Sequence, residues 1–262
     1  MKLSGEKMKN PVIVVGMGEM GSVFARGFLR TGHPVFPVVR GMDMASVADD
    51  VNEPELVLIA VAEADLHSVL QQIPSAWSDR LVLLQNELLA NDWLQYELDP
   101  TVISVWFEKK KGMDSKVIIP SPVFGKHASL VAEALASIDI ASHILQNSEA
   151  LLFELVLKNV YILTTNIAGI QTGGTVGELW ADHRDVATAV ANEVIELQQA
   201  LTGQQFDSAA LIDGMVMAFN GDLNHQCMGR SAPGRLARAL ELAEKNGLNL
   251  EALKKISAAS LT

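Results

Sequence analysis

Three glycines near the start of the chain have the spacing that a nucleotide phosphate requires. An apolar run, Val12 to Val15, precedes the motif, and a helical pattern follows it. The motif itself consists of Gly16, Met17, Gly18, Glu19, Met20 and Gly21. In a strand–turn–helix unit the first glycine permits the sharp turn, the second lets the backbone approach a pyrophosphate, and the third lets the helix pack on the strand. We predict a dinucleotide-binding turn here; the alternative is a tight turn without a ligand.

The end of the next apolar run indicates which dinucleotide would bind. Pro34 to Val39 reads as a second strand, and Arg40 and Gly41 follow it. NAD-binding units usually place an acid at this point for the ribose hydroxyls, whereas an arginine can bind the 2′-phosphate of NADP. The nearest acid, Asp43, lies beyond the strand end. We therefore predict NADP as the cofactor, although Arg40 could simply be a solvated strand-end residue.

Lys158 is the residue whose surroundings best suit acid–base chemistry. It lies in a largely apolar stretch, Phe153 to Leu163, where an unpaired ammonium is costly. A lysine that faces a substrate can polarise a carbonyl oxygen and give it a proton. Glu154 precedes Lys158 by one helical turn, so an ordinary ion pair explains the lysine equally well.

Two asparagines are further candidates. Asn86 stands just past the apolar run Leu81 to Leu84, at the strand end where ligands bind in open α/β sheets. It could hold the cofactor or the substrate, or it could be a turn or cap residue. Asn166 lies two helical turns beyond Lys158, offset by about 80° around the helix. It could share a cleft with Lys158 or satisfy a neighbouring helix end.

Metal and hydrolase chemistry find no support in the sequence. The histidines show no metal-ligand spacing and there is no GxSxG elbow, so we predict no metal. These histidines are His33, His67, His127, His143, His183 and His225. The single cysteine, Cys227, excludes an internal disulfide and fits a reducing compartment.

The elements that would position these residues fall into two parts. The first half alternates apolar strands with helices, which predicts a Rossmann-type parallel sheet of the α/β class over residues 1–147. Within it, Val102 to Phe107 and Lys116 to Ile119 read as a hairpin with Lys109, Lys110 and Lys111 at its solvated tip. Residues 148–262 show helical spacing, which predicts an all-helical second domain. Its expected helices are Glu149 to Ile170, Asp185 to Leu201, Ser208 to Phe219, Pro233 to Asn246 and Leu250 to Ala258.

Composition limits the classes of partner. The 262 residues are 49% hydrophobic and carry a net charge of −11, which predicts a globular protein without nucleic-acid or anionic-membrane partners. We found no uninterrupted apolar stretch of roughly 20 residues, the length that spans a bilayer. The polar start, Met1 to Asn10, has no signal-peptide core. We therefore expect a cytoplasmic protein that acts on a small molecule.

The chain resembles the ketopantoate reductase family, within the wider group of reductases similar to 6-phosphogluconate dehydrogenase. The glycine motif, Arg40 and Gln85–Asn86 carry the resemblance in the first half, and Lys158, Asn166 and Gly177–Leu179 carry it in the second. The resemblance implies that the residue at Lys158 is the general acid, that Asn86 contacts cofactor and substrate, and that Asn166 helps to hold the substrate. It also implies a helical domain that binds substrate and could mediate homodimer formation.

Several positions depart from the family pattern. Glu63 replaces a common lysine, Glu87 a glycine and Ile162 an asparagine, and the substrate-binding glutamate aligns loosely with Ser231. We predict an NADPH-dependent reductase of a small carbonyl compound, a 2-oxo acid similar to ketopantoate. One alternative is a non-catalytic dinucleotide-binding module, and a weaker one is an enzyme nearer to imine or 3-hydroxyacid reductases.

Overall fold

The computed structural model describes residues 9–260 and divides the chain into two units, one ending at Leu151 and the other beginning at Leu152. Residues 1–8, most of the polar start considered above, lie outside the described residues, as do residues 261–262. The first unit is a mostly parallel sheet covered by helices, and the second is helical. The predicted fold class is therefore confirmed.

A seven-stranded sheet with the order β2-β1-β3-β4-β5-β8-β9 forms the core of the first unit. Its strands are β1 (Val12–Val15), β2 (Val35–Val38), β3 (Leu56–Ile59), β4 (Leu81–Leu83), β5 (Thr101–Ile103), β8 (Ser121–Phe124) and β9 (Ser142–Ile144). Neighbouring strands run parallel except at the β5–β8 pair. Every residue of β1 and β3 is buried, as expected for strands covered on both faces, whereas β2 lies at an edge and tolerates Pro37.

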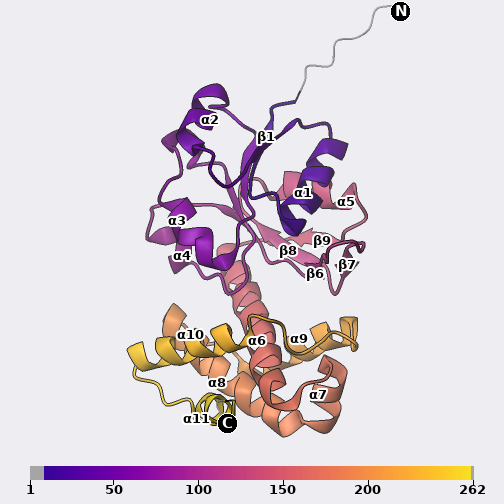
Figure 1. Cartoon of the computed structure of the whole chain (residues 1–262), viewed down its shortest axis with the longest axis vertical. Helices are drawn as coiled ribbons and strands as arrows, with labels where there is room; N and C mark the ends of the chain where they lie inside the picture. The colour runs from indigo at the N-terminus through magenta and orange to yellow at the C-terminus, as the bar shows by residue number, and fades with distance from the viewer. Residues whose placement is uncertain (1–8, 261–262) are drawn as a thin grey trace, which may run out of the picture. The chain divides into compact units, whose positions relative to one another are not determined.

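Helices cover both faces of this sheet. They are α1 (Glu19–Arg30), α2 (Met44–Asp50), α3 (Leu66–Leu70), α4 (Asn91–Leu94) and α5 (Ala128–Ala136), with short 3-10 turns at Glu63–Asp65 and Ser75–Trp77. Figure 1 shows α1 beside α5, away from α2 and α3. Gly27 allows the close approach of α1 to α5, because a Cβ there would lie 2.5 Å from the carbonyl oxygen of Ala134. The approach brings the buried ring of Phe24 into the core.

The hairpin predicted between residues 102 and 119 is only partly right. Its tip pairs as a separate two-stranded sheet, β6 (Phe107–Glu108) with β7 (Lys116–Val117). The earlier part of the run instead forms β5, which pairs with the unpredicted strand β8 in the main sheet. Both runs are apolar, so hydrophobicity alone could not separate an internal strand from a hairpin arm.

The second unit consists of helices joined by short turns. They are α6 (Ser148–Thr172), α7 (Val176–Asp182), α8 (Arg184–Thr202), α9 (Ser208–Gly221), α10 (Ala232–Lys245) and α11 (Glu251–Ala259). The five predicted helices match all of these except α7, which the prediction missed. A buried hydrogen bond of 2.9 Å from Asn159 to Gln198 joins α6 to α8.

Helix α6 qualifies by length and composition as a membrane span, which the sequence analysis did not anticipate. Its most apolar 18-residue window has a mean hydropathy of 1.3, and 67% of that window is buried within the protein. A central helix in a helical core has the same properties. One such helix is weak evidence for a membrane protein, and its burial favours the core role.

Candidate functional site

The glycine motif forms the turn between β1 and α1. Gly16 has φ = +93°, and a Cβ on it would lie 2.7 Å from the carbonyl oxygen of Ala60. A Cβ on Gly21 would collide with the carbonyl oxygen of Gly16, so only glycine allows this packing of helix on turn. Gly18 differs, because a Cβ there would meet nothing within 4 Å. The local fold therefore needs Gly16 and Gly21, whereas Gly18 leaves space open above the helix N-terminus.

A cavity of about 620 Å³ lies over this turn, at the carboxyl ends of β1, β2 and β3. Its lining includes Gly16, Met17, Gly18, Arg40, Gly41, Ala60, Val61, Ala62, Asp65 and Ser68. This is the edge at which open α/β sheets bind ligands, and the cavity has the size of a small-molecule site. Of the six motif residues, the first three line the cavity and the last three form the first turn of α1.

Arg40 lines the cavity and has an acidic neighbour that the sequence analysis missed. Its side chain is 93% exposed, and its Nη2 lies 3.4 Å from Oδ2 of Asp65. Asp43, the acid considered earlier, instead accepts hydrogen bonds from the amides of Ala45 and Ser46 and begins α2. Asp65 comes six residues after the end of β3. Its place near a strand end was a signal in the sequence that could have identified it. Any anion bound by Arg40 would have to compete with this carboxylate.

Two amide side chains follow β4. The buried Gln85 donates hydrogen bonds to the carbonyl oxygens of Ile59 (2.7 Å) and Val61 (3.2 Å), which ties the end of β4 to the end of β3. Asn86 is half-buried, and its Nδ2 donates to Oε1 of Glu63 at 2.9 Å. Since a carboxylate only accepts, this bond turns the Oδ1 of Asn86 away from Glu63. Asn86 can therefore offer a hydrogen-bond acceptor to a ligand.

Glu87 adopts a backbone conformation that favours glycine. Its φ is +58°, in the left-handed region. This conformation costs a residue with a Cβ about 1 kcal/mol or more. The resemblance implied a glycine at this position, and this chain has a glutamate there in a conformation that favours glycine. Strained backbone of this kind gathers at functional sites.

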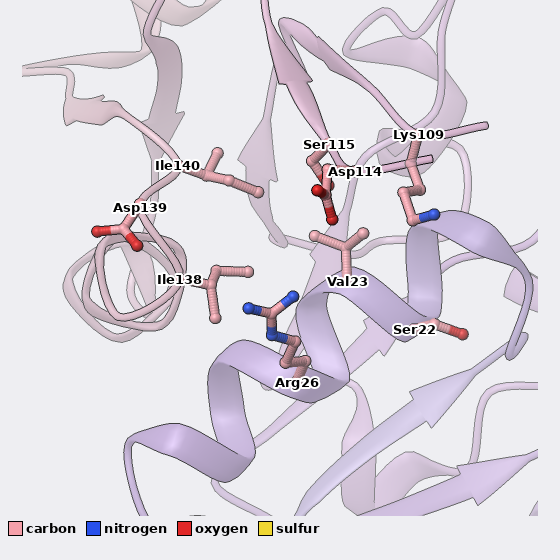
Figure 2. A pocket seen from close by; sticks show the side chains of 9 residues that line it. All are labelled: Ser22, Val23, Arg26, Lys109, Asp114, Ser115, Ile138, Asp139 and Ile140. Atoms are coloured by element: carbon pink, nitrogen blue, oxygen red, sulfur yellow. The ribbon is translucent and has the colours of Figure 1, made fainter. Parts of the chain in front are cut away.

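A second hollow of about 490 Å³ lies on the outer side of α1 (Figure 2). Arg26 on α1 and Asp114 beyond β6 line it, so its lining carries both signs of charge. Lys109 also lines it, and its Nζ lies 3.5 Å from Oε2 of Glu19 in the glycine motif. The prediction that Lys109 belongs to a solvated tip is therefore wrong, because this ion pair holds its side chain with only 21% exposed. Lys110 and Lys111 are exposed as predicted.

In the second unit, Lys158 lies half-buried in the middle of α6. Burial and the nearby positive charge of Arg235 lower the pKa of Lys158 to about 7. Its Nζ lies 5.8 Å from the ring centroid of Tyr161. Within residues 9–260 no ion pair joins Lys158 to Glu154, and burial raises the pKa of that glutamate. The pair with Glu154 that the sequence offered as an alternative therefore does not form, and the pKa of Lys158 suits proton transfer near neutral pH.

Asn166 is held by two hydrogen bonds. Its Nδ2 donates to the carbonyl oxygen of Ile162 at 2.9 Å, and its Oδ1 accepts from Nη1 of Arg235 at 3.3 Å. Arg235 is half-buried on α10, and the sequence analysis missed it. Ser231 is exposed at the N-cap of α10 and makes no side-chain capping hydrogen bond. The structure thus brings Lys158, Asn166 and Arg235 together, with Ser231 one turn before the arginine.

The Gly177–Leu179 motif has a structural role at the start of α7. Glu178 and Thr175 form a capping box, in which Glu178 accepts from the Thr175 amide at 2.8 Å. A Cβ on Gly177 would lie 2.9 Å from the carbonyl oxygen of Leu223, and Leu179 is fully buried. The motif that carried much of the resemblance therefore anchors a helix and the segment beside it.

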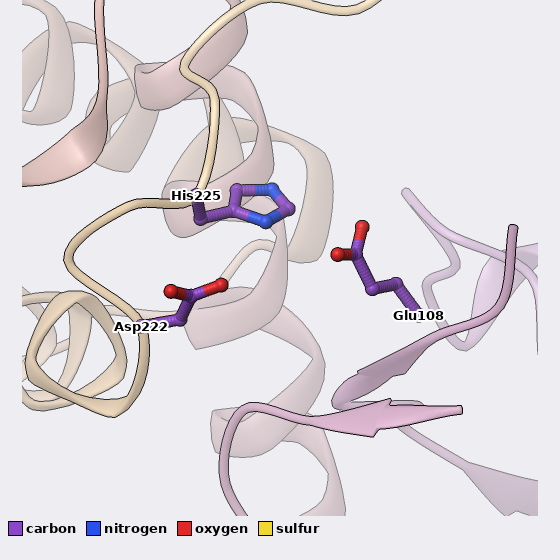
Figure 3. A group of neighbouring side chains, drawn as sticks. All are labelled: Glu108, Asp222 and His225. Atoms are coloured by element: carbon purple, nitrogen blue, oxygen red, sulfur yellow. The ribbon is translucent and has the colours of Figure 1, made fainter. Parts of the chain in front are cut away.

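That neighbouring segment carries Asp222 and His225 after α9 (Figure 3). The backbone amide of His225 donates a hydrogen bond to the carbonyl oxygen of Asp222 at 3.0 Å. The ring centroid of His225 lies 6.2 Å from the ring centroid of Tyr161. Two residues later, Cys227 is buried, and burial together with Glu178 raises its pKa to about 11. This thiol is therefore unsuited to nucleophilic chemistry.

Comparison with known proteins identifies the fold. No family model and no curated protein matches the sequence. Among solved structures, a PanE/ApbA family ketopantoate reductase from Ralstonia eutropha matches with a TM-score of 0.66 and 16% identity, over 95% of this chain and 97% of that one. A 2-dehydropantoate 2-reductase from Porphyromonas gingivalis matches with a TM-score of 0.67 and 15% identity, over 97% of this chain and 100% of that one.

A D-mandelate dehydrogenase, solved with NADH and anilino(oxo)acetate, has the same architecture. It matches with a TM-score of 0.67 and 13% identity, over 95% of this chain and 97% of its own. The chain thus has the ketopantoate reductase fold along almost its entire length. At such identities the similarity concerns the fold, and the chemistry has to be argued from the residues.

Proposed function

We propose that this protein is an NADPH-dependent reductase that converts a small 2-oxo acid to the hydroxy acid, as a divergent member of the ketopantoate reductase family. The observation that carries the proposal is the cavity over the Gly16–Gly18 turn, with Arg40 in its lining. In this proposal the first unit binds the dinucleotide, and the helical unit supplies substrate-binding residues and could mediate a homodimer. A dimeric ketopantoate reductase from Staphylococcus aureus has the same fold. We also expect a cytoplasmic protein.

The residues of the first unit fit a dinucleotide. The open space at Gly18 accommodates a pyrophosphate against the amides of the α1 N-terminus. Arg40 would bind the 2′-phosphate, whose charge would displace Asp65 from the guanidinium. Asn86, with its Oδ1 turned from Glu63, would accept a hydrogen bond from a ribose or substrate hydroxyl.

In the proposed reaction, the protein's own contribution is a proton transfer from Lys158. NADPH, when bound, supplies a hydride to the carbonyl carbon of the substrate. As the C=O π bond breaks, Nζ of Lys158 donates a proton to the oxygen, and the alcohol forms. Lys158 is left neutral and takes a proton from solvent before the next turnover. A pKa of about 7 makes both the loss and the recovery of this proton accessible at neutral pH.

The decisive experiment measures NADPH oxidation over a panel of 2-oxo acids, together with calorimetry of NADPH binding. Lys158→Met should lower kcat at least about 100-fold, within the range of general acid catalysis, while the Kd for NADPH stays unchanged. Arg184→Gln removes an exposed cation that stacks on Trp180, and it serves as the control with wild-type turnover. Equal loss of turnover and of NADPH binding in Lys158→Met would contradict the assigned role.

The cofactor assignment has a separate test. Arg40→Ala should weaken NADPH binding much more than NADH binding, because only NADPH carries the 2′-phosphate. Asp65→Asn should strengthen NADPH binding, since it removes the competing carboxylate. If Arg40→Ala weakened both cofactors equally, the preference for NADPH would be rejected.

A non-catalytic dinucleotide-binding module is the second candidate. The observation that favours it is the hydrogen bond from Asn86 to Glu63. This bond occupies the amide nitrogen of Asn86, a proposed catalytic residue. Its acceptor, Glu63, stands where the resemblance implied a lysine. A module of this kind would bind NADPH with ordinary affinity, but none of the 2-oxo acids in the panel would cause NADPH to be oxidised. The same substrate panel therefore separates the two proposals.

A further inference from the structure

The hollow on the outer side of α1 is separate from the cavity over the glycine turn. It has a volume of about 490 Å³, and among the described residues none that lines it also lines that cavity. Its walls come from α1, from the loop between β6 and β7, and from the segment that joins α5 to β9. The volume suits a small molecule, and the proposed reduction uses none of the residues that line it. The hollow is therefore a candidate for a second ligand.

The loop between β6 and β7 is fastened to the start of α1. Lys109 lies in this loop, and its Nζ is 3.5 Å from Oε2 of Glu19, the first residue of α1. The same ammonium donates a hydrogen bond to the carbonyl oxygen of Met113. The charge of Lys109 is thus already compensated. These contacts hold the loop that carries Asp114 beside the helix that carries Arg26.

Arg26 and Asp114 bring opposite charges to the hollow without neutralising each other. Both residues are exposed, and within residues 9–260 neither forms an ion pair or a side-chain hydrogen bond. Figure 2 shows the guanidinium of Arg26 on one side of Val23, and Asp114 with Ser115 on the other. Two opposite charges in one hollow match a ligand that carries both an anionic and a cationic group.

Three buried aliphatic residues, Val23, Ile138 and Ile140, form the apolar part of the hollow. The amide of Ile140 donates to the carbonyl oxygen of Leu135 at 3.0 Å, and Asp139 has φ = +61°. This hydrogen bond and this left-handed residue are those of a Schellman motif, which fixes the backbone after α5. In Figure 2, Ile138 and Ile140 extend toward Val23, whereas the carboxylate of Asp139 points away. The hollow therefore combines a fixed apolar wall with two opposite charges.

We propose that this hollow binds a free α-amino acid with an aliphatic side chain. The guanidinium of Arg26 would bind the carboxylate of the ligand, and Asp114 would accept hydrogen bonds from its ammonium group. The aliphatic side chain would pack against Val23, Ile138 and Ile140. An amino acid carries these three groups on one carbon atom, so one small molecule satisfies the whole lining. The proposal goes beyond the proposed reductase and does not depend on it.

The first test compares ligands by calorimetry with the protein free of NADPH. At least one of L-leucine, L-isoleucine and L-valine should bind with a Kd of about 1 mM or tighter. Leucinamide, which lacks the carboxylate, and 4-methylpentanoate, which lacks the ammonium, should each bind at least about 10-fold more weakly than leucine. Glycine should lose about as much, because it has no apolar side chain. Failure of all three amino acids to bind, or equal binding of leucinamide, would overturn the proposal.

The second test uses matched variants. Arg26→Gln and Asp114→Asn should each weaken leucine binding about 10- to 100-fold, the loss expected for a charged hydrogen-bonding partner. Arg30→Gln on the same helix and Asp139→Asn should bind leucine as the wild type does. All four residues are exposed, so the melting temperature should stay unchanged. In Arg26→Gln the advantage of leucine over leucinamide should disappear. Equal losses in Asp114→Asn and Asp139→Asn would overturn the assignment of the ammonium to Asp114.

The third test places the ligand by nuclear magnetic resonance of isoleucine methyl groups. Leucine should shift the signals of Ile138 and Ile140, assigned with Ile138→Val and Ile140→Val, and should leave Ile162 beside Lys158 unchanged. A shift at Ile162 alone would put leucine at the proposed substrate site and would overturn the proposal. If leucine shifts Ile138 and Ile140 while no 2-oxo acid is reduced, the amino-acid site stands and the proposed reductase activity fails.

Discussion

The candidate site of the first unit depends on the backbone, whereas that of the second unit depends on side chains. In the first unit the backbone is decisive, because Gly16 and Gly21 are required by close contacts and Gly18 leaves open space. In the second unit side chains from separate helices are decisive, since burial and then the charge of Arg235 on α10 lower the pKa of Lys158 on α6. The contrast implies that the proposed cofactor site tolerates changes of side chain better than the proposed substrate site does. The same contrast predicts which variants affect binding, which affect catalysis and which affect folding.

The largest expected effects separate folding from binding within the glycine motif. Gly21→Ala should destabilise the first unit severely, because the added Cβ collides with the carbonyl oxygen of Gly16. Gly18→Ala should leave the melting temperature unchanged, since its Cβ meets nothing, yet it should weaken NADPH binding about 10- to 100-fold by blocking the pyrophosphate. Thermal unfolding and calorimetry distinguish the two. An unchanged NADPH affinity in Gly18→Ala would argue against a pyrophosphate at this turn.

This contrast explains how much could be predicted from the sequence. The glycine turn is a local feature, so its spacing, the strand before it and the helix after it appear together in the first 30 residues. Lys158 and Asn86 stand out because each is a polar residue beside an apolar run. Arg235 meets Asn166 across 69 residues, and Asp65 meets Arg40 across 25, so no short motif could reveal either pair. Such partners follow from tertiary packing, which a single sequence does not specify.

The pH dependence of reduction tests the second unit. The pKa of Lys158 is lowered to about 7, so the ammonium that donates the proton prevails below that pH and is lost above it. We expect kcat/KM for reduction to be constant below pH 7 and to fall about tenfold per pH unit well above it. Its charged or titratable neighbours include Arg235 on α10 and Tyr161 on α6. A flat profile between pH 6 and pH 9 would mean that Lys158 is not the acid.

A smaller effect is expected from the contact between Asn86 and Glu63. Glu63→Ala removes the acceptor that orients the Asn86 amide, and we expect kcat to fall about 2- to 10-fold, as for one hydrogen bond, with little change in NADPH affinity. Glu63→Gln keeps an acceptor oxygen and should lie closer to the wild type. If Glu63→Ala instead raised turnover, the bond would be inhibitory, and the non-catalytic module would gain support.

The smallest expected effect concerns the strained turn after Asn86. Glu87 and Glu97 both have positive φ, +58° and +57°, and glycine at either position should relieve a strain of about 1 kcal/mol, partly offset by the entropy of glycine in the unfolded chain. Both variants should therefore unfold at the same or a slightly higher denaturant concentration. Only Glu87→Gly should alter steady-state kinetics, because this turn follows Asn86 directly. Equal kinetic behaviour of the two variants would show that the left-handed turn at Glu87 serves the fold of the first unit and leaves catalysis unaffected.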